Sequence, residues 1–191
     1  MSRNRLEAFS DGVIAILITI MVLDLKVPTG HDLASLQPLI PILSAYVLSF
    51  VYLAIYWNNH HHMFHLVHQI NGKILWANMH LLFWLSLIPF GTAWINEGGL
   101  ATMPTFFYGA VLSMAALAYY VLQMTIIASQ GKDSQLREAV GRDRKGRGSV
   151  ILYLCALPLA LVAQWASMAI YVLVALIWLV PDKRIESKFN T

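Results

Sequence analysis

The chain has 191 residues, of which 58% are hydrophobic and only 12% are charged, and its formal net charge is +3. Soluble domains carry about 25% charged residues, and the mean hydropathy of +0.62 departs from them in the same direction. A water-soluble fold cannot bury this much apolar surface, so lipid must be the solvent for most of it. The composition excludes a soluble enzyme, a disordered tail and a nucleic-acid-binding domain, and it predicts an integral membrane protein.

Six apolar segments follow one another along the chain, and roughly 120 to 130 residues suffice for six spanning helices. Pro28 and Gly30 follow the first segment, and the polar residues 96–99 end the third. The last apolar run, residues 150–180, is too long for one span, and Gln164 and Ser167 divide it. The sequence therefore predicts an all-α membrane protein with one domain over residues 1–191 and helices over residues 5–25, 38–60, 74–95, 104–128, 150–163 and 166–180.

The basic residues predict the orientation of the chain in the membrane. With six spans and a cytoplasmic N-terminus, 12 of the 13 lysines and arginines fall in cytoplasmic segments, and only Lys26 falls outside. Residues 129–149, the long polar segment, are expected to form a solvated inner loop, with binding to anionic lipid as an alternative. Both termini are thus expected in the cytoplasm. Trp94, Trp165 and Trp178 lie near span ends, as interfacial anchors do.

The start of the first predicted helix carries three polar residues that bear on function. Arg5, Ser10 and Asp11 lie at or inside the membrane boundary, where ionisable groups are costly and usually paired. In one interpretation they bind partners on neighbouring helices. In the other, Ser10 or Asp11 caps the helix and the long side chain of Arg5 reaches the interface.

The body of the same helix presents an apolar stripe. At about 100° per residue, Gly12, Ile16, Thr19, Ile20 and Leu23 share a sector of roughly 100°. By itself such a stripe is most simply a lipid-facing or packing surface. Thr19 is the one hydroxyl in the body of this helix, and a lone threonine often bonds its own backbone.

Several motifs together resemble the transmembrane protein 175 family. The first helix begins with Arg5-x-x-x-Phe9-Ser10-Asp11, and the second ends with Trp57-x-x-His60-His61-x-x-Phe64. The third contains Leu75-Trp76-Ala-Asn78 and Ser86-Leu-Ile-Pro89-Phe90-Gly-Thr92, and the chain finishes with Trp178-Leu-Val-Pro181. The family comprises potassium-permeable channels of endosomes and lysosomes, with shorter bacterial relatives.

The resemblance implies a bacterial single-repeat member of this family. Such a member is a homotetramer of six-helix subunits in the plasma (inner) membrane, and its first helices line a central pore. The resemblance thus implies a leak-type potassium channel rather than an enzyme, with three further copies of itself and membrane lipid as partners. It implies no cofactor and no nucleic acid, and K⁺ as the permeant ion.

The resemblance also implies roles for particular residues. By distance from the Phe-Ser-Asp motif, the narrowest layer of the pore falls on Ile16, and further layers fall on Thr19 or Ile20 and on Leu23. The polar network that braces the pore helix is assigned to Arg5, Ser10, Asp11, His61, Trp76 and Asn78. The run His60-His61-His62 leaves the register of the histidine open.

A pore of this kind would select ions without a carbonyl filter. The sequence contains no Thr-Val-Gly-Tyr-Gly stretch and no acidic residue in the middle of the first helix, so stacked carbonyls and acidic rings are unavailable. We hypothesise a hydrophobic constriction at which ions shed part of their hydration, at a higher cost for Na⁺ than for K⁺. The Thr19 hydroxyls would replace part of the lost water.

Other functions remain as alternatives. His61, His65 and His68 have the spacing that places three imidazoles on one helical face, but no carboxylate or cysteine lies nearby, so a solvated or network role is favoured over a metal site. A secondary transporter would have paired broken helices in matching halves, and no internal repeat is present. A proton-conducting membrane protein is a further alternative. A membrane enzyme is disfavoured because the sequence has no nucleophile elbow and no Gly-rich phosphate loop.

Overall fold

The computed structural model describes residues 2–67, 69–131, 134–141 and 143–179, and within these ranges the regular structure is helical. The elements in chain order are α1 (Arg3–Leu23), the 3₁₀ helix η1 (Leu33–Leu39), α2 (Ile40–His65), α3 (Gly72–Ser86), α4 (Ile88–Gly98), α5 (Thr102–Gln130), α6 (Gln135–Val140), α7 (Arg144–Ala160) and α8 (Gln164–Leu179).

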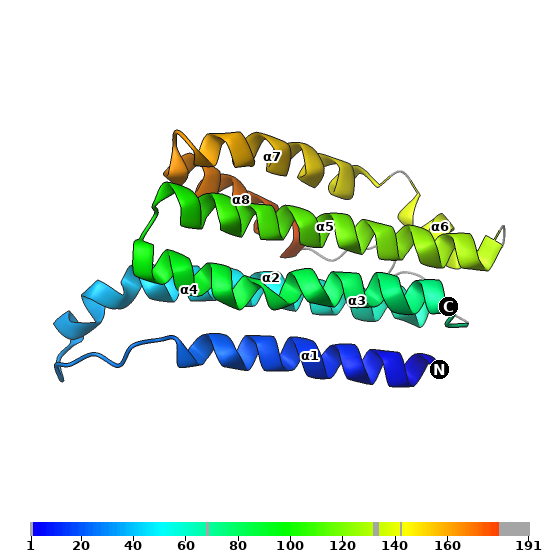
Figure 1. The fold of residues 1–191 in the computed structure, drawn as a ribbon, viewed down its shortest axis with the longest axis horizontal. Coiled ribbons are helices and arrows are strands. Elements are labelled where there is room, and N and C mark those ends of the chain that lie inside the picture. Colours follow the sequence, from blue (N-terminus) through cyan, green and yellow to red (C-terminus); the bar gives the residue numbers. More distant parts are fainter. Residues whose placement is uncertain (1, 68, 132–133, 142, 180–191) are drawn as a thin grey trace.

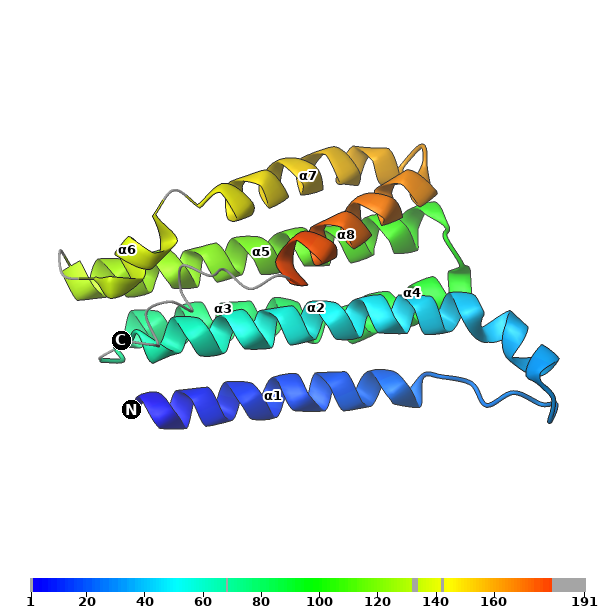
Figure 2. The ribbon, with the colours of Figure 1, turned by 180° about the vertical axis from the view of Figure 1, so that it is seen from behind.

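The long helices run side by side along one axis, in layers (Figures 1 and 2). α1 forms one edge of the bundle and packs on α2, α3 and α4. α5 packs against α3 and α4 on the far side of that layer, and α7 and α8 pack on α5 and on each other. α1 is therefore covered on one side only, which leaves its other face open along the whole bundle.

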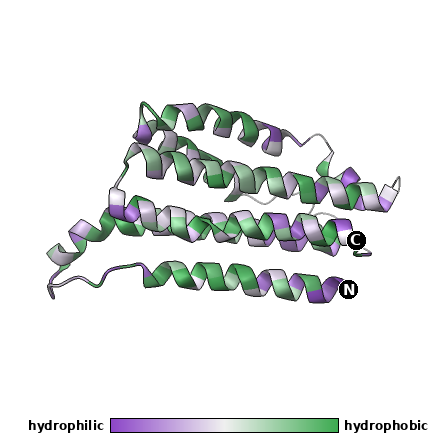
Figure 3. Cartoon of the chain, in the orientation of Figure 1, coloured by the Kyte–Doolittle hydropathy of each residue, from purple (hydrophilic) through white to green (hydrophobic). Residues whose placement is uncertain are grey.

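Hydropathy follows the bundle axis, with apolar residues along the helices and more polar residues at the ends (Figure 3). Four described segments are long and apolar enough to cross a membrane: Arg3–Leu23, Leu33–His65, Gly72–Gly98 and Thr102–Gln130. The apolar helix Gln164–Leu179 is shorter, with 16 residues. These helices are those of a multi-pass membrane protein, as the composition predicts.

The third predicted helix, residues 74–95, is interrupted in the structure. α3 ends at Ser86 and α4 begins at Ile88, with Leu87 between them. Pro89 lies in the first turn of α4; it has no N–H to donate, and its ring crowds the carbonyl of Leu85 four residues earlier. The span predicted over residues 74–95 thus corresponds to one apolar segment, Gly72–Gly98, which a helix-starting proline divides into two helices.

The polar segment 129–149, expected to be a loop, contains helix in the structure. α6 begins after Ser134, whose hydroxyl accepts a hydrogen bond from the Arg137 backbone N–H, and it ends at Gly141, where φ is 49°. α7 begins at Arg144, six residues before the predicted start, because the Asp143 carboxylate caps it by accepting from the Gly146 N–H at 2.8 Å. Hydropathy could not reveal α6 or the first six residues of α7, since local capping rather than apolar character starts them.

The connection from α1 to α2 is ordered by a similar cap. Asp32 accepts hydrogen bonds from both the backbone N–H and the hydroxyl of Ser35, at the start of η1. These bonds lower the pKa of the Asp32 carboxyl from its ordinary value. η1 then leads into α2, which has Pro41 in its first turn.

A chain of buried hydroxyls joins three helices inside the bundle. The Thr92 hydroxyl donates to the Ile88 carbonyl at 2.8 Å, so it accepts from the Ser49 hydroxyl at 2.6 Å. Ser49 has then used its single proton and accepts from the Tyr108 hydroxyl at 2.9 Å. This chain links α5, α2 and α4 in a region where lipid and side chains supply no competing partners.

Some expectations concern residues that lie outside the described ranges. His68 of the histidine set and Val180 at the end of the last predicted helix are two of them, together with the basic residues Lys132, Arg142, Lys183, Arg184 and Lys188.

Candidate pore-lining helix and its polar contacts

α1 has two faces of opposite character. Its buried face consists of Leu6, Ser10, Ile14, Leu17 and Met21, which recur every three or four residues and contact α2, α3 and α4. The opposite face carries the stripe expected from the sequence. Within the single chain, 57% of Ile16, 44% of Ile20 and 80% of Leu23 are exposed.

Thr19 lies on the exposed face and bonds its own helix. Its hydroxyl donates to the Ile16 carbonyl at 2.9 Å, as expected of a lone threonine in a helix. The single hydroxyl proton is thereby used, so the oxygen presents its lone pairs to the open side of α1. This arrangement suits acceptance from water or contact with a cation.

Three buried polar side chains tie the start of α1 to α2 and α3. The Ser10 hydroxyl donates to the Leu6 carbonyl at 2.9 Å and accepts from the Asn78 amide nitrogen at 3.0 Å. The Asn78 amide oxygen accepts from His60 Nε2 at 2.7 Å. Ser10, His60 and Asn78 are each at most 1% exposed, and we refer to them as the Ser–Asn–His cluster.

The cluster fixes the tautomer of His60. An amide oxygen only accepts, so Nε2 carries the proton, and in the neutral ring Nδ1 is an acceptor. Nδ1 is buried without a hydrogen-bond partner among the described residues, and the ring stacks on Phe64 at 4.3 Å between centroids.

The histidine that contacts Asn78 is therefore His60. The resemblance assigned His61 to this network and left the register among the three histidines open. His61 is only half-buried, and it stacks on Trp57 at 6.1 Å and lies edge-on to His65 at 4.5 Å. Consecutive residues point about 100° apart on a helix, so the buried face of α2 includes His60 and leaves its neighbour at the edge.

Asp11 has a different partner from that cluster. Trp57 Nε1 donates to the Asp11 carboxylate at 3.0 Å, which makes a second link between α1 and α2. Trp57 belongs to the motif at the end of the second predicted helix, but the resemblance does not assign it to the network. An indole N–H within reach of a carboxylate at the same membrane depth was the signal that could have found it.

Arg5 and Trp76 do not join these contacts. Arg5 is exposed and forms no hydrogen bond or ion pair with the described residues. Trp76 is 78% exposed. The arginine that does bind within the chain is Arg3, which pairs with Glu7 at 3.4 Å and donates to the His65 carbonyl at 3.3 Å. The i, i+4 spacing of Arg3 and Glu7 was the sequence signal for it.

The described residues contain no group of three or more histidine, cysteine or acidic side chains that could hold a metal ion. Of the three histidines considered for a metal, His61 and His65 are in contact, and His68 lies outside the described ranges.

The structure is thus that of a multi-pass membrane helix bundle whose first helix has one exposed apolar face and polar contacts on its buried side. The sequence model of the family described as "Endosomal/lysosomal potassium channel TMEM175" matches residues 5–89. A relative that is 53% identical also matches this chain over its full length. The chain therefore belongs to the TMEM175 family.

That relative is a potassium channel of a Chryseobacterium species, and the match covers 100% of this chain and 99% of the relative. A zebrafish protein named an endosomal/lysosomal proton channel is 37% identical over 135 residues, which cover 68% of this chain and 25% of that protein. The crystal structure of a lysosomal potassium-selective channel TMEM175 homolog from Chamaesiphon minutus superposes with a TM-score of 0.81 at 28% identity. This match covers 94% of this chain and 97% of the Chamaesiphon minutus chain.

Proposed function

We propose that this chain is the subunit of a potassium-permeable, leak-type cation channel. The observation that carries the proposal is the 53% identity to the potassium channel of the Chryseobacterium species over essentially the whole of both chains. The apolar face of α1 supports it in one respect: no other described helix of the chain covers this face, so α1 helices from further copies can meet there around a shared axis.

The channel is a homotetramer in the plasma membrane of a bacterium, with both termini in the cytoplasm. Each subunit contributes six spans, of which α7 and α8 are the fifth and sixth. One helix cannot enclose an aqueous path, so a pore lined by α1 needs several copies of the chain. The positive-inside distribution of Lys and Arg supports this orientation.

The constriction is hydrophobic and lies on α1. Ile16 forms the narrowest layer, with Thr19 or Ile20 and then Leu23 beyond it. Passing ions shed part of their hydration there, at a higher cost for Na⁺ than for K⁺, and the Thr19 oxygen replaces part of the lost water. The hydroxyl geometry supports this role, because its proton is already bound to the Ile16 carbonyl.

The polar contacts at the start of α1 brace the pore helix. The Ser–Asn–His cluster and the Asp11–Trp57 hydrogen bond hold α1 against α2 and α3 from behind. Arg5 and Trp76 are exposed within one subunit, so any bracing role for them requires contact with a neighbouring subunit.

The proposal is tested by ion flux in liposomes that contain the purified protein. We expect K⁺ flux that exceeds Na⁺ flux in the wild type, and we expect Ile16→Asn to raise flux and lower the preference for K⁺, because a polar ring retains water in the constriction. Ile151→Asn is the matched control: this isoleucine is 62% exposed on α7, away from α1. It should leave flux unchanged.

Two results would contradict the proposal at different levels. Absence of cation flux in the wild type rejects the channel. Flux and selectivity that are the same in Ile16→Asn as in the wild type keep the channel and reject Ile16 as its constriction.

Proton conduction is the second candidate, because the zebrafish relative is named a proton channel. Proteoliposomes with a pH gradient, an internal pH dye, and K⁺ with valinomycin to compensate charge separate the two. A pH change much faster than in protein-free liposomes would favour a proton-conducting protein, whereas no protein-dependent pH change, together with K⁺ flux measured without valinomycin, favours the potassium channel.

A further inference from the structure

Asp24 lies where α1 ends, directly after the most exposed residue of the apolar stripe. It is the C-cap of α1 and follows Leu23, which is 80% exposed. Its carboxylate is exposed and makes no hydrogen bond or ion pair with the described residues. At 1.5 Å per residue, it lies about 12 Å beyond Ile16 along the helix axis.

The backbone adds to the charge of this carboxylate. The C-terminal end of a helix carries a partial negative charge of roughly half an elementary charge, and the last turn of α1 contains no basic residue to offset it. The carboxylate and the helix end therefore have the same sign at the same place.

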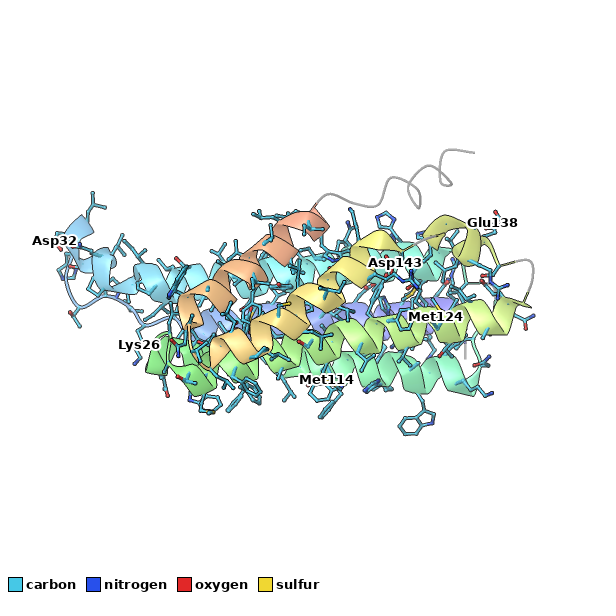
Figure 4. The ribbon with its side chains drawn as sticks, turned by 90° about the horizontal axis from the view of Figure 1, so that it is seen from above. Lys26, Asp32, Met114, Met124, Glu138 and Asp143 are labelled. Carbon is cyan, nitrogen blue, oxygen red and sulfur yellow. The ribbon has the colours of Figure 1, made fainter. Side chains whose placement is uncertain are left out.

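Negative charge prevails at this whole end of the bundle. The connections there, residues 24–32, 96–101 and 161–163, carry the carboxylates Asp24, Asp32 and Glu97 against one ammonium, that of Lys26. The opposite end carries the basic residues of α6 and α7. Figure 4 shows Lys26 and Asp32 at one end of the molecule, and Glu138 and Asp143 at the other.

We propose that Asp24, once per subunit, forms a ring of carboxylates at one mouth of the pore that concentrates cations ahead of the constriction. This inference rests on the proposed channel and on α1 lining its pore. The ring lies outside the narrow layers, so cations pass it with their water. It sets the rate of cation entry and leaves the discrimination between K⁺ and Na⁺ to the constriction.

Salt dependence distinguishes such a ring from a structural role. Fixed charges act over about 10 Å at 0.1 M salt, over some 30 Å at 0.01 M, and over only about 3 Å at 1 M. Charged entrances raise the local concentration of counter-ions by factors from about ten upward at low salt. Neutralising Asp24 should therefore matter in dilute salt and not in concentrated salt.

The experiment is single-channel recording in planar bilayers of neutral lipid, in symmetric KCl at 0.02 M and at 1 M. We expect Asp24→Asn to lower conductance at 0.02 M by roughly two- to tenfold, to change it little at 1 M, and to leave the K⁺/Na⁺ preference intact. Asp32→Asn is the matched control. It removes the same charge from the same end, at the start of η1 rather than at α1, and asparagine caps a helix as well as aspartate does.

Chemical restoration of the charge covers the case in which Asp24→Asn fails to assemble. Asp24→Cys in a Cys155→Ser background is treated with a sulfonate-bearing methanethiosulfonate reagent, and separately with an ammonium-bearing one. The anionic adduct should restore conductance at 0.02 M, and the cationic adduct should lower it further.

Three outcomes overturn the inference. Equal conductance of Asp24→Asn and the wild type at both salt concentrations rejects the ring, and so does an equal loss at 0.02 M and 1 M, which indicates a damaged pore. An effect of Asp32→Asn as large as that of Asp24→Asn shows that diffuse surface charge, and not a ring at Asp24, sets the conductance. Absence of wild-type conductance instead refutes the proposed function itself.

Discussion

The Ser–Asn–His cluster shows how a membrane protein uses a few buried hydrogen bonds to fix one helix. Asn78 is the central member, since it donates to Ser10 and accepts from His60. In the bilayer interior no water replaces a lost partner, so each of these groups depends on its neighbour. α1 has no other side chains on its buried face that could fix its rotation as specifically, because the rest are apolar.

Asn78→Leu should destabilise the protein by about 1–3 kcal/mol, because leucine keeps the volume but leaves the N–H of His60 buried without an acceptor. The free energy of unfolding in mixed micelles, measured by denaturant titration, checks this value. Asn58→Leu is the control, since Asn58 is half-buried and has no hydrogen-bond partner among the described residues. Equal stability of the two variants would show that the cluster contributes nothing.

Of the six residues assigned to the polar network, Ser10, Asp11 and Asn78 make hydrogen bonds between helices, and Arg5, His61 and Trp76 make none with the described residues. Arg5, Ser10 and Asp11 are placed at the start of the helix by the order of the chain alone. The choice among three consecutive histidines depends on the rotation of α2, which tertiary packing sets and which spacing within one helix cannot reveal. The exposure of Trp76 and Arg5 was equally beyond reach, since it depends on which helices cover α1 and α3.

At the scale of elements, a close contact between the Tyr171 side chain and the backbone of Gly109 joins α8 to α5. Tyr171 of α8 is buried, and its hydroxyl lies so near Gly109 of α5 that a Cβ there would meet it at 1.8 Å. Small residues let membrane helices approach in this way, and packing rather than the hydrophobic effect then holds them together.

Gly109→Ala should lower the stability by about 1–3 kcal/mol, because Tyr171 must move out of a packed position. Gly148→Ala is the matched control in α7, where nothing lies within 4 Å of the added Cβ. There, alanine should be neutral or stabilising by roughly 0.5–1 kcal/mol through its higher helix propensity. Thermal unfolding of both variants in the same detergent checks the pair, and similar losses in both would contradict the contact.

Hydropathy predicts the apolar helices well and their interruptions poorly. The run through residues 74–95 is apolar throughout, and only Pro89 shows that α3 and α4 are separate elements. α6 and the first turn of α7 contain basic residues and glycines, so they arise from capping by Ser134 and Asp143. Hydropathy therefore locates the apolar core of this bundle and misses the helical turns that begin in polar segments.

At the scale of the whole molecule, α1 lies at the edge of the chain, and the other described helices cover only one of its sides. In their most apolar stretches, α1 and the segment Leu33–His65 are the least buried of the four candidate spans, at 28% and 22%, against 50% for the segment Gly72–Gly98. A helix so open is suited to contact with further copies of the chain around a shared axis.

Native mass spectrometry of the protein released from nanodiscs should therefore give a mass of about four times 21.4 kDa. The proposed homotetramer requires this value, because four copies each supply one α1 to the pore. The Asn78→Leu variant measured alongside reports whether the brace behind α1 is needed for assembly. A monomer as the sole species in the wild type would rule out a pore formed by α1.

The helices that lie side by side in the outer layers differ in length, and this has a consequence for the surrounding lipid. α5 has 29 residues and is about 44 Å long, whereas α7 has 17 and is about 26 Å long, with polar residues in its first turns. The hydrocarbon core of a bilayer is about 30 Å thick. If α7 spans the membrane, the bilayer beside it must thin to match its length, whereas α5 is longer than the hydrocarbon core and must tilt or extend beyond it. The bilayer around each subunit would thus be thinner on one flank, and the protein would favour membranes of short-chain lipid.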